Sequence, residues 1–120
     1  MAKSVDSPLT QAYMHFLRLT KAIDGDNSSP SLDANERALL EVLALNWHSG
    51  TPMTVMQAMA LKDLGSPATM HRRIARLRKL GMIQPHEDPH DTRIKRLVLT
   101  PAAQEYFAQL GQTLQTALAS

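Results

Sequence analysis

The chain has 120 residues, of which 43% are hydrophobic and 20% charged, and this composition is typical of one soluble globular domain. It contains no cysteine, which excludes a disulfide scaffold and a thiolate zinc site, and no apolar run that could span a membrane. The polar start MAKSVDSP does not resemble a signal peptide, so we expect a cytoplasmic protein with no membrane partner.

The net charge is only +2, but its distribution along the chain is uneven. Residues 62–100 hold nine Lys/Arg and four Asp/Glu, whereas residues 1–61 hold four and six. A basic segment after an acidic one indicates an anionic partner, although a solvated charged face is the alternative.

The first half of the chain predicts three helices. Apolar residues recur at spacings of three and four over 9–23, and the stretch DGDNSSPS at 24–31 is a loop. Asp33 with Glu36 forms a capping box that opens a second helix, ending near residue 48. A third, short helix over 55–61 is capped in the same way by Thr54 and Gln57.

The clearest signal is SPATMHRRIARLRKLG, residues 66–81. Ser66 is an N-cap residue, Pro67 suits the first helical position, and Gly81 suits the C-terminal cap. We therefore predict a helix over 67–80 that holds five Lys/Arg and no acid.

The last third of the chain predicts a β-hairpin and a final helix. Strands are expected over 82–87 and 94–99, with the turn-rich DPHDTR at 88–93 between them. Thr100-Pro101 then opens a helix with one apolar stripe. The stripe consists of Ala103, Tyr106, Phe107, Leu110, Leu114, Ala117 and Leu118.

The stretch HEDPH, residues 86–90, matches the zinc-protease pattern H-E-x-x-H. A hydrolase of this kind would use His86 and His90 as ligands and Glu87 as base, which requires a helix. Pro89 disfavours a helix there, and the flanks predict strands. We therefore expect no metal, no other cofactor and no catalytic residue, and hence no enzyme.

A helical wheel assigns a face to each side chain of the basic helix. Met70, Ile74 and Leu77 form the buried stripe, and Leu80 lies at its edge. The opposite face combines small residues with arginines, which suits the major groove, where arginine binds guanine. This exposed face holds Ala68, Thr69, Arg72, Arg76 and Lys79, with Arg73 at its border.

Two features favour double-stranded over single-stranded nucleic acid. Residues 48–105 contain no aromatic side chain on which splayed bases could stack. The short helix, tight turn and basic helix also form a helix-turn-helix, which docks in a major groove.

Three stretches, in this order of elements, resemble the MarR family of bacterial winged helix-turn-helix transcription regulators. They are LDANERALLEVLAL (32–45), SPATMHRRIARLRKLGMI (66–83) and DPHDTRIKRLVLT (88–100). The chain contains three motifs of the family. They are a serine-capped recognition helix that ends in L-x-x-x-G-[LM]-[IV], a wing with D-x-x-D-x-R, and a closing strand that ends in L-T. The expected fold is thus mainly α with a small β-hairpin wing, a winged helix-turn-helix with N- and C-terminal dimerisation helices.

The resemblance implies a homodimer that binds double-stranded DNA through one domain, residues 1–120. Residues 33–100 would form its DNA-binding core, with helix 67–80 in the major groove and wing 84–96 at the minor groove. Residues 9–24 and 101–119 would form the dimer. The expected DNA-binding residues are Ser66, Ala68, Thr69, Arg72, Arg73, Arg76, Asp91, Arg93 and Lys95. The expected dimer contacts are Tyr13, Phe16, Tyr106, Phe107, Leu110 and Leu114, because four of the five aromatics lie in the terminal helices.

The sequence also departs from the family pattern. Pro85 and Thr92 stand where arginines are common, and the terminal helices are short for a dimerisation arm. A second function therefore stays open, a winged-helix module for protein interaction or assembly in a replication or mobile-element complex. Nothing in the sequence identifies a small-molecule effector.

Overall fold

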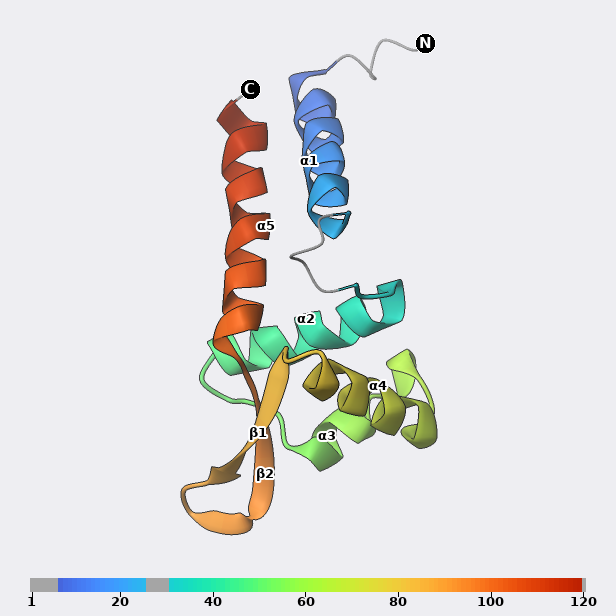
Figure 1. The fold of residues 1–120 in the computed structure, drawn as a ribbon, viewed down its shortest axis with the longest axis vertical. Coiled ribbons are helices and arrows are strands. Elements are labelled where there is room, and N and C mark those ends of the chain that lie inside the picture. Colours follow the sequence, from blue (N-terminus) through green and yellow to red (C-terminus); the bar gives the residue numbers. More distant parts are fainter. Residues whose placement is uncertain (1–6, 26–30, 120) are drawn as a thin grey trace. The chain divides into compact units, whose positions relative to one another are not determined.

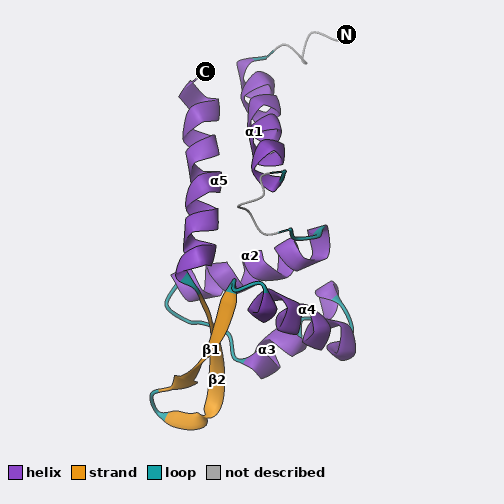
Figure 2. Cartoon of the chain, viewed as in Figure 1, coloured by secondary structure: helices purple, strands orange, loops and turns teal. Residues whose placement is uncertain are grey.

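The computed structural model describes residues 7–25 and 31–119, and most of the predicted loop 24–31 lies outside these ranges. The described chain is mostly helical with one two-stranded antiparallel hairpin, so the predicted fold class is confirmed (Figures 1 and 2). The elements are α1 (Pro8–Asp24), α2 (Ala34–His48), α3 (Val55–Met59), α4 (Pro67–Lys79), β1 (Ile83–Asp88), β2 (Asp91–Leu99) and α5 (Pro101–Ala119).

The chain forms two compact units. One unit comprises residues 32–104 and contains α2, α3, α4, the hairpin and the start of α5. The other comprises residues 1–31 and 105–120 and contains α1 and most of α5. No helix in the described ranges is both long and apolar enough to cross a membrane.

The predicted helix starts are confirmed by their capping hydrogen bonds. At α2, Glu36 N–H donates to Asp33 Oδ1 at 2.7 Å, and Asp33 N–H donates to Glu36 Oε1 at 3.0 Å. Thr54 and Gln57 make the same reciprocal pair at α3. Each pair satisfies two backbone donors that a helix start leaves without a partner, which fixes where the helix begins.

The end of α4 is a Schellman motif. Gly81 N–H donates to the Arg78 carbonyl and Met82 N–H to the Leu77 carbonyl, both at 2.9 Å. Gly81 has a φ of +76°, which glycine adopts without steric cost. The helix therefore ends where the sequence predicts, within one residue.

The hairpin differs from the prediction in the length of its turn. Only Pro89 and His90 lie outside the strands, because β2 begins at Asp91 instead of at Ile94. Asp88 Oδ1 accepts a hydrogen bond from His90 N–H at 2.8 Å, which closes the tight turn. The pairing is irregular between Glu87 and Asp88, so three residues of β2 are accommodated as a bulge.

The core of the unit 32–104 lies where α2, α4 and the base of the hairpin meet. The wheel assignment is confirmed, since Met70, Ile74 and Leu77 are the buried residues of α4. A third backbone segment joins the sheet, because Leu97 N–H donates to the Met53 carbonyl at 2.8 Å. The buried apolar side chains of this unit are Leu39, Leu40, Leu43, Ala58, Met70, Ile74, Leu77, Met82, Ile83, Leu97, Leu99 and Ala103.

The other unit leaves much apolar surface exposed. Helix α1 has no buried residue, and Leu9 and Tyr13 are 82% and 55% exposed. Of the apolar stripe predicted for α5, Leu114 and Leu118 are 52% and 76% exposed. A narrower stripe of Ala103, Tyr106, Thr113 and Ala117 is buried instead.

Candidate nucleic-acid interface

The first two turns of α4 carry a line of polar side chains. Ser66 Oγ caps the helix by accepting from Thr69 N–H at 3.2 Å, and the two hydroxyls are 3.1 Å apart. Arg72 Nη2 donates to Thr69 Oγ1 at 3.3 Å. The spacing of three residues places these side chains on one edge of the helix, with Ser66 and Arg72 exposed. This edge offers hydroxyls and a guanidinium to a ligand that approaches the start of α4.

Arg73 has a structural partner inside the chain. Its Nη1 donates a hydrogen bond to the Leu64 carbonyl, in the 3-10 turn Lys62–Leu64 that precedes α4. This hydrogen bond holds the guanidinium against the backbone of the helix-turn-helix. Arg73 thus ties α4 to the turn before it.

Arg76 pairs with an acid from another helix, although α4 itself holds no acid. Arg76 Nε lies 2.5 Å from Glu36 Oε2, and the Glu36 side chain is only 6% exposed. The other carboxylate oxygen of Glu36 caps α2. Sequence reasoning assigned Glu36 to the cap alone, because its second partner lies forty residues away.

The remaining surface of α4 is cationic and accessible. Ala68, His71, Arg78 and Lys79 are exposed along the helix, and no acid lies between Ser66 and Gly81. Together with Arg72, the cationic side chains of Arg78 and Lys79 present positive charge along the helix. Such a surface attracts a polyanion.

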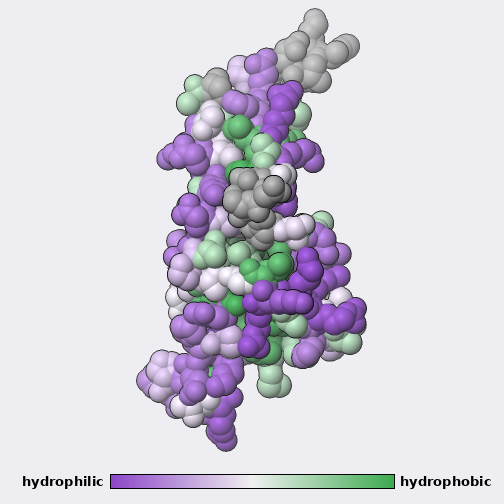
Figure 3. Space-filling model, viewed as in Figure 1, coloured by the Kyte–Doolittle hydropathy of each residue, from purple (hydrophilic) through white to green (hydrophobic). Residues whose placement is uncertain are grey.

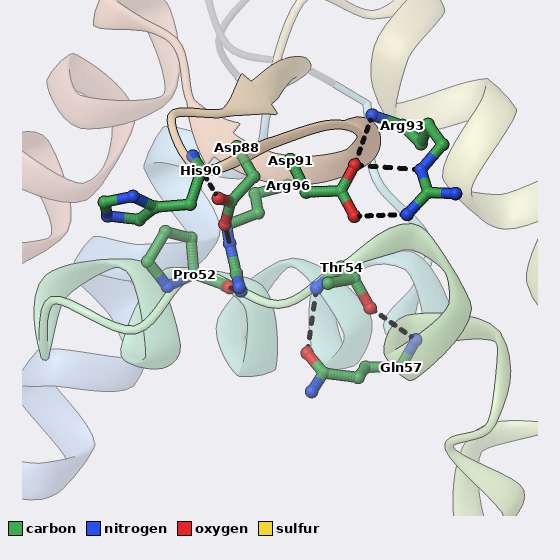
Figure 4. Close-up of polar contacts among 8 residues, drawn as sticks. All are labelled: Pro52, Thr54, Gln57, Asp88, His90, Asp91, Arg93 and Arg96. Atoms are coloured by element: carbon green, nitrogen blue, oxygen red, sulfur yellow. Dashed lines mark hydrogen bonds and ion pairs between the residues drawn. The ribbon is translucent and has the colours of Figure 1, made fainter.

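The wing carries an exposed arginine held in a fixed orientation (Figure 4). Arg93 Nε and Nη2 donate to the two oxygens of Asp91 at 3.1 and 3.0 Å, while the Arg93 side chain stays 88% exposed. The hydrogen bond from Arg93 lowers the pKa of Asp91, and Asp91 raises the pKa of Arg93. This bidentate geometry leaves Nη1 directed away from Asp91 and available to a ligand.

Lys95, another predicted site residue, pairs with Glu87 on the opposite strand at 3.3 Å. Both side chains are about half exposed, at 47% and 56%. An exposed pair of this kind is weak and can exchange partners with a phosphate. In the view of Figure 3, hydrophilic side chains cover most of the hairpin.

Arg96 is a residue of the wing that the sequence analysis did not identify. Its Nε donates to Asp88 Oδ2 at 2.6 Å and its Nη1 to the Pro52 carbonyl at 2.9 Å. The hydrogen bond from Arg96 and the one from His90 N–H lower the pKa of the Asp88 carboxyl. In the sequence Arg96 only continues the alternation of β2, and its Pro52 partner is 44 residues away.

The HEDPH stretch is not a helix, as predicted. His86, Glu87 and Asp88 lie in β1, and Pro89 and His90 form the turn. His86 Nε2 lies 2.9 Å from Gln84 Nε2 of the same strand. Within residues 7–25 and 31–119, no group of three or more His, Cys, Asp or Glu side chains is placed to hold a metal ion.

The predicted dimer residues differ in exposure. Tyr13 and Leu114 are more than half exposed, and Phe16, Phe107 and Leu110 are partly so. Tyr106 is only 3% exposed in the single chain, with its ring centroid 5.5 Å from that of Phe107. The structure thus places Tyr106 in the chain's own interior and leaves Tyr13 and Leu114 at the surface.

No family model and no curated protein matches the chain. Among solved structures, a probable transcriptional regulator from Pseudomonas aeruginosa is 28% identical, with a TM-score of 0.52 over 92% of this chain and 80% of its own. A MarR-like transcriptional regulator from Thermotoga maritima is 17% identical, with a TM-score of 0.63 over 99% and 79%. The structure of MarR is 18% identical, with a TM-score of 0.55 over 92% and 78%. The first of these likenesses supports the role of a transcriptional regulator, and the other two support the MarR-like winged-helix fold.

Proposed function

Because the chain has the MarR-like winged-helix fold, we propose that it is a cytoplasmic, homodimeric regulator of transcription that binds specific sequences in double-stranded DNA. The observation that carries the proposal is the exposed edge of α4, where Ser66, Thr69 and Arg72 are already linked to one another. A helix of this kind enters the major groove with its N-terminal residues against the bases.

Arg72 is the residue that we assign to a base. It lies in the first two turns of α4, is exposed, and is oriented by Thr69. Arginine donates two parallel hydrogen bonds to O6 and N7 of guanine, which lysine cannot reproduce. Lys79 lies two turns further on, where the helix leaves the groove, so we assign it at most to a phosphate. Arg73 and Arg76 would act mainly by holding α4, given their partners at Leu64 and Glu36.

We assign Arg93 to the minor groove. Its guanidinium is exposed and oriented by Asp91, which suits insertion into a narrow groove of negative potential. Replacing Arg93 by alanine would then weaken binding most where the flanks of the site are A·T-rich. Equal losses of affinity on A·T-rich and G·C-rich flanks would indicate that Arg93 contacts only a phosphate.

The apolar surface of the unit that contains α1 supports the proposed dimer. Helix α1 buries no residue in the single chain, and Leu9, Tyr13, Leu114 and Leu118 are more than half exposed. Exposed apolar surface of this kind marks an interface. A two-fold dimer would place two copies of α4 on half-sites about 10–10.5 bp apart.

The test is selection of bound duplexes from a random DNA library, followed by titration of the winning sequence and of a scrambled one. We expect a near-palindromic consensus and binding at least ~10³-fold tighter than to the scrambled duplex. Loss of affinity with added salt should be steeper than for an uncharged contact surface, because counterions are released. If no consensus emerges and the two duplexes bind with equal affinity, the proposal is wrong. The alternative function, a winged-helix module for protein interaction or assembly, is then favoured.

A further inference from the structure

The guanidinium of Arg96 connects the wing to the helix-turn-helix. On one side Nε donates to Asp88 at the end of β1, and on the other Nη1 donates to the Pro52 carbonyl in the segment between α2 and α3. Figure 4 shows Arg96 lying between these two partners. The two bonds thus span from the turn of the hairpin to the body of the unit.

Asp88 extends this connection into the turn. Its Oδ2 accepts from Arg96, while its Oδ1 accepts from His90 N–H at 2.8 Å. Asp88 also pairs directly with Asp91 in the strand register, and Asp91 holds Arg93. A continuous series of contacts therefore runs from the Pro52 carbonyl through Arg96, Asp88 and Asp91 to the guanidinium of Arg93.

Burial distinguishes the two ion pairs of this series. The Asp88 side chain is 11% and the Arg96 side chain 34% exposed, whereas Arg93 is 88% exposed. The Asp88–Arg96 pair is therefore the less exposed of the two. Arg96 also has two acceptors at fixed positions, so it constrains the direction of the wing. The Asp91–Arg93 pair lies within the wing, so it orients Arg93 only relative to the wing itself.

Among the described residues, the backbone contacts between the hairpin and the segment before α3 are made at Arg96 and Leu97 and not nearer the turn. Leu97 N–H donates to the Met53 carbonyl, and Thr54 forms a β-bridge with Arg96. The residues beyond them toward the turn are mostly exposed, namely Glu87, Pro89, His90, Thr92, Arg93 and Lys95. The Arg96 side chain therefore lies between the part of the wing that backbone contacts hold and the distal part that carries Arg93.

We propose that Arg96 is a positioning residue, which sets the direction of the wing relative to α4 and thereby delivers Arg93 to the minor groove. This inference rests on the proposed function, in which Arg93 contacts DNA. Two of the three guanidinium nitrogens of Arg96, Nε and Nη1, are engaged within the chain, so we assign Arg96 no DNA contact of its own.

The test is a double-mutant cycle between Arg93 and Arg96, read as affinity for the selected duplex. Arg93→Ala should weaken binding about fivefold or more. Arg96→Ala should weaken it to a similar extent, and the double variant should be no weaker than either single one. Arg96→Lys should behave like Arg96→Ala, since a point charge cannot reach both acceptors with the same geometry.

The control is a second cycle between Arg72 and Arg96. Arg72 lies on α4, which Arg96 does not orient, so these two losses should multiply. Unfolding curves of each variant give the folded fraction at the temperature of the titration. If Arg96→Ala does not fold, Asp88→Asn replaces it in both cycles, because it weakens the same connection at the other end.

The outcomes separate this inference from the function on which it rests. If Arg93→Ala weakens binding and the Arg93 and Arg96 losses multiply, Arg96 does not act through Arg93, and the inference is overturned while the proposed function stands. Wild-type affinity in Arg96→Lys would also overturn it and assign Arg96 a purely electrostatic role. Wild-type affinity in Arg93→Ala would remove the wing contact from the proposed function and the inference with it.

Discussion

Gly65 joins the 3-10 turn to α4 in a conformation that only glycine adopts easily, with φ +152° and ψ 175°. A Cβ there would lie 3.1 Å from both Arg73 Nη1 and Thr69 Cγ2. We predict that Gly65→Ala lowers the free energy of unfolding by ~1–3 kcal/mol, the cost of a strained backbone residue. Urea unfolding followed by circular dichroism measures the change.

Gly111 supplies the matched control for this substitution. It lies within α5, and a Cβ there would meet nothing within 4 Å. Gly111→Ala should therefore stabilise the chain, by up to about 1 kcal/mol, because alanine favours the helix. The account of Gly65 fails if the two substitutions change stability in the same direction.

At the scale of single residues, the sequence predicts the helix face on which a side chain lies better than it predicts the residue that the side chain contacts. The wheel separated the buried and exposed sides of α4, because helical geometry alone determines them. It could not separate Arg72 from Arg76, which share the exposed face. Their difference arises from Glu36, a residue that only the packing of α2 against α4 brings to Arg76.

At the scale of elements, the hairpin should depend on pH through Asp88. Arg96 and His90 N–H lower the pKa of this carboxyl from its usual 3.8. A carboxylate with a lowered pKa stabilises the folded state above its unfolded pKa, and this contribution is lost as the pH falls through the folded pKa. The stability gap between wild type and Asp88→Asn should therefore be constant from about pH 5 to 7 and shrink below about pH 4.

Urea unfolding of both proteins over this pH range provides the measurement. Asp91 also has a lowered pKa and is present in both proteins, so only the last of its causes, the raising effect of the Asp88 charge, remains in the difference. A gap that stays constant to about pH 3 would contradict the role given to the Asp88 carboxylate.

The helix boundaries could be predicted because their signals are local. The cap residues at Asp33, Thr54 and Ser66 bond to backbone three residues on, so a short stretch of sequence contains the whole interaction. The hairpin turn was predicted too long, since DPHDTR is rich in turn-forming residues. Its last three residues extend β2 instead, because Asp88 closes the turn after two residues.

At the scale of the molecule, the exposed apolar face of α5 predicts the oligomeric state. Leu114 and Leu118 lie one helical turn apart and are 52% and 76% exposed. Replacing both by aspartate would place two charges in the proposed interface, which should convert the dimer into a monomer. Light scattering at micromolar concentration measures the mass of each protein.

Leu45 on α2 is the control residue for this experiment. It is 69% exposed, like Leu118, but belongs to the unit 32–104. Leu45→Asp should leave the mass unchanged. A wild-type protein that is monomeric at the same concentration would contradict the dimer outright.

The winged helix-turn-helix could be predicted as a whole because capping, periodicity and turn residues agree along the chain. The exposure of individual apolar residues in the terminal helices could not be predicted from the sequence. The spacing in α5 does not tell which of two adjacent stripes is buried, and the structure buries the one containing Ala103 and Thr113.

The central claim is that α4 reads bases through Arg72, and its most direct test compares Arg72→Ala with Lys79→Ala. Both proteins are titrated with the selected duplex and its single-base variants at several salt concentrations. Arg72→Ala should lose ~1–3 kcal/mol and relax the preference at one position of each half-site. Lys79→Ala should weaken all duplexes alike and flatten the salt slope by about one unit. If Arg72→Ala keeps the wild-type ranking of the duplexes, Arg72 does not contact a base, and the proposed placement of α4 in the groove is wrong.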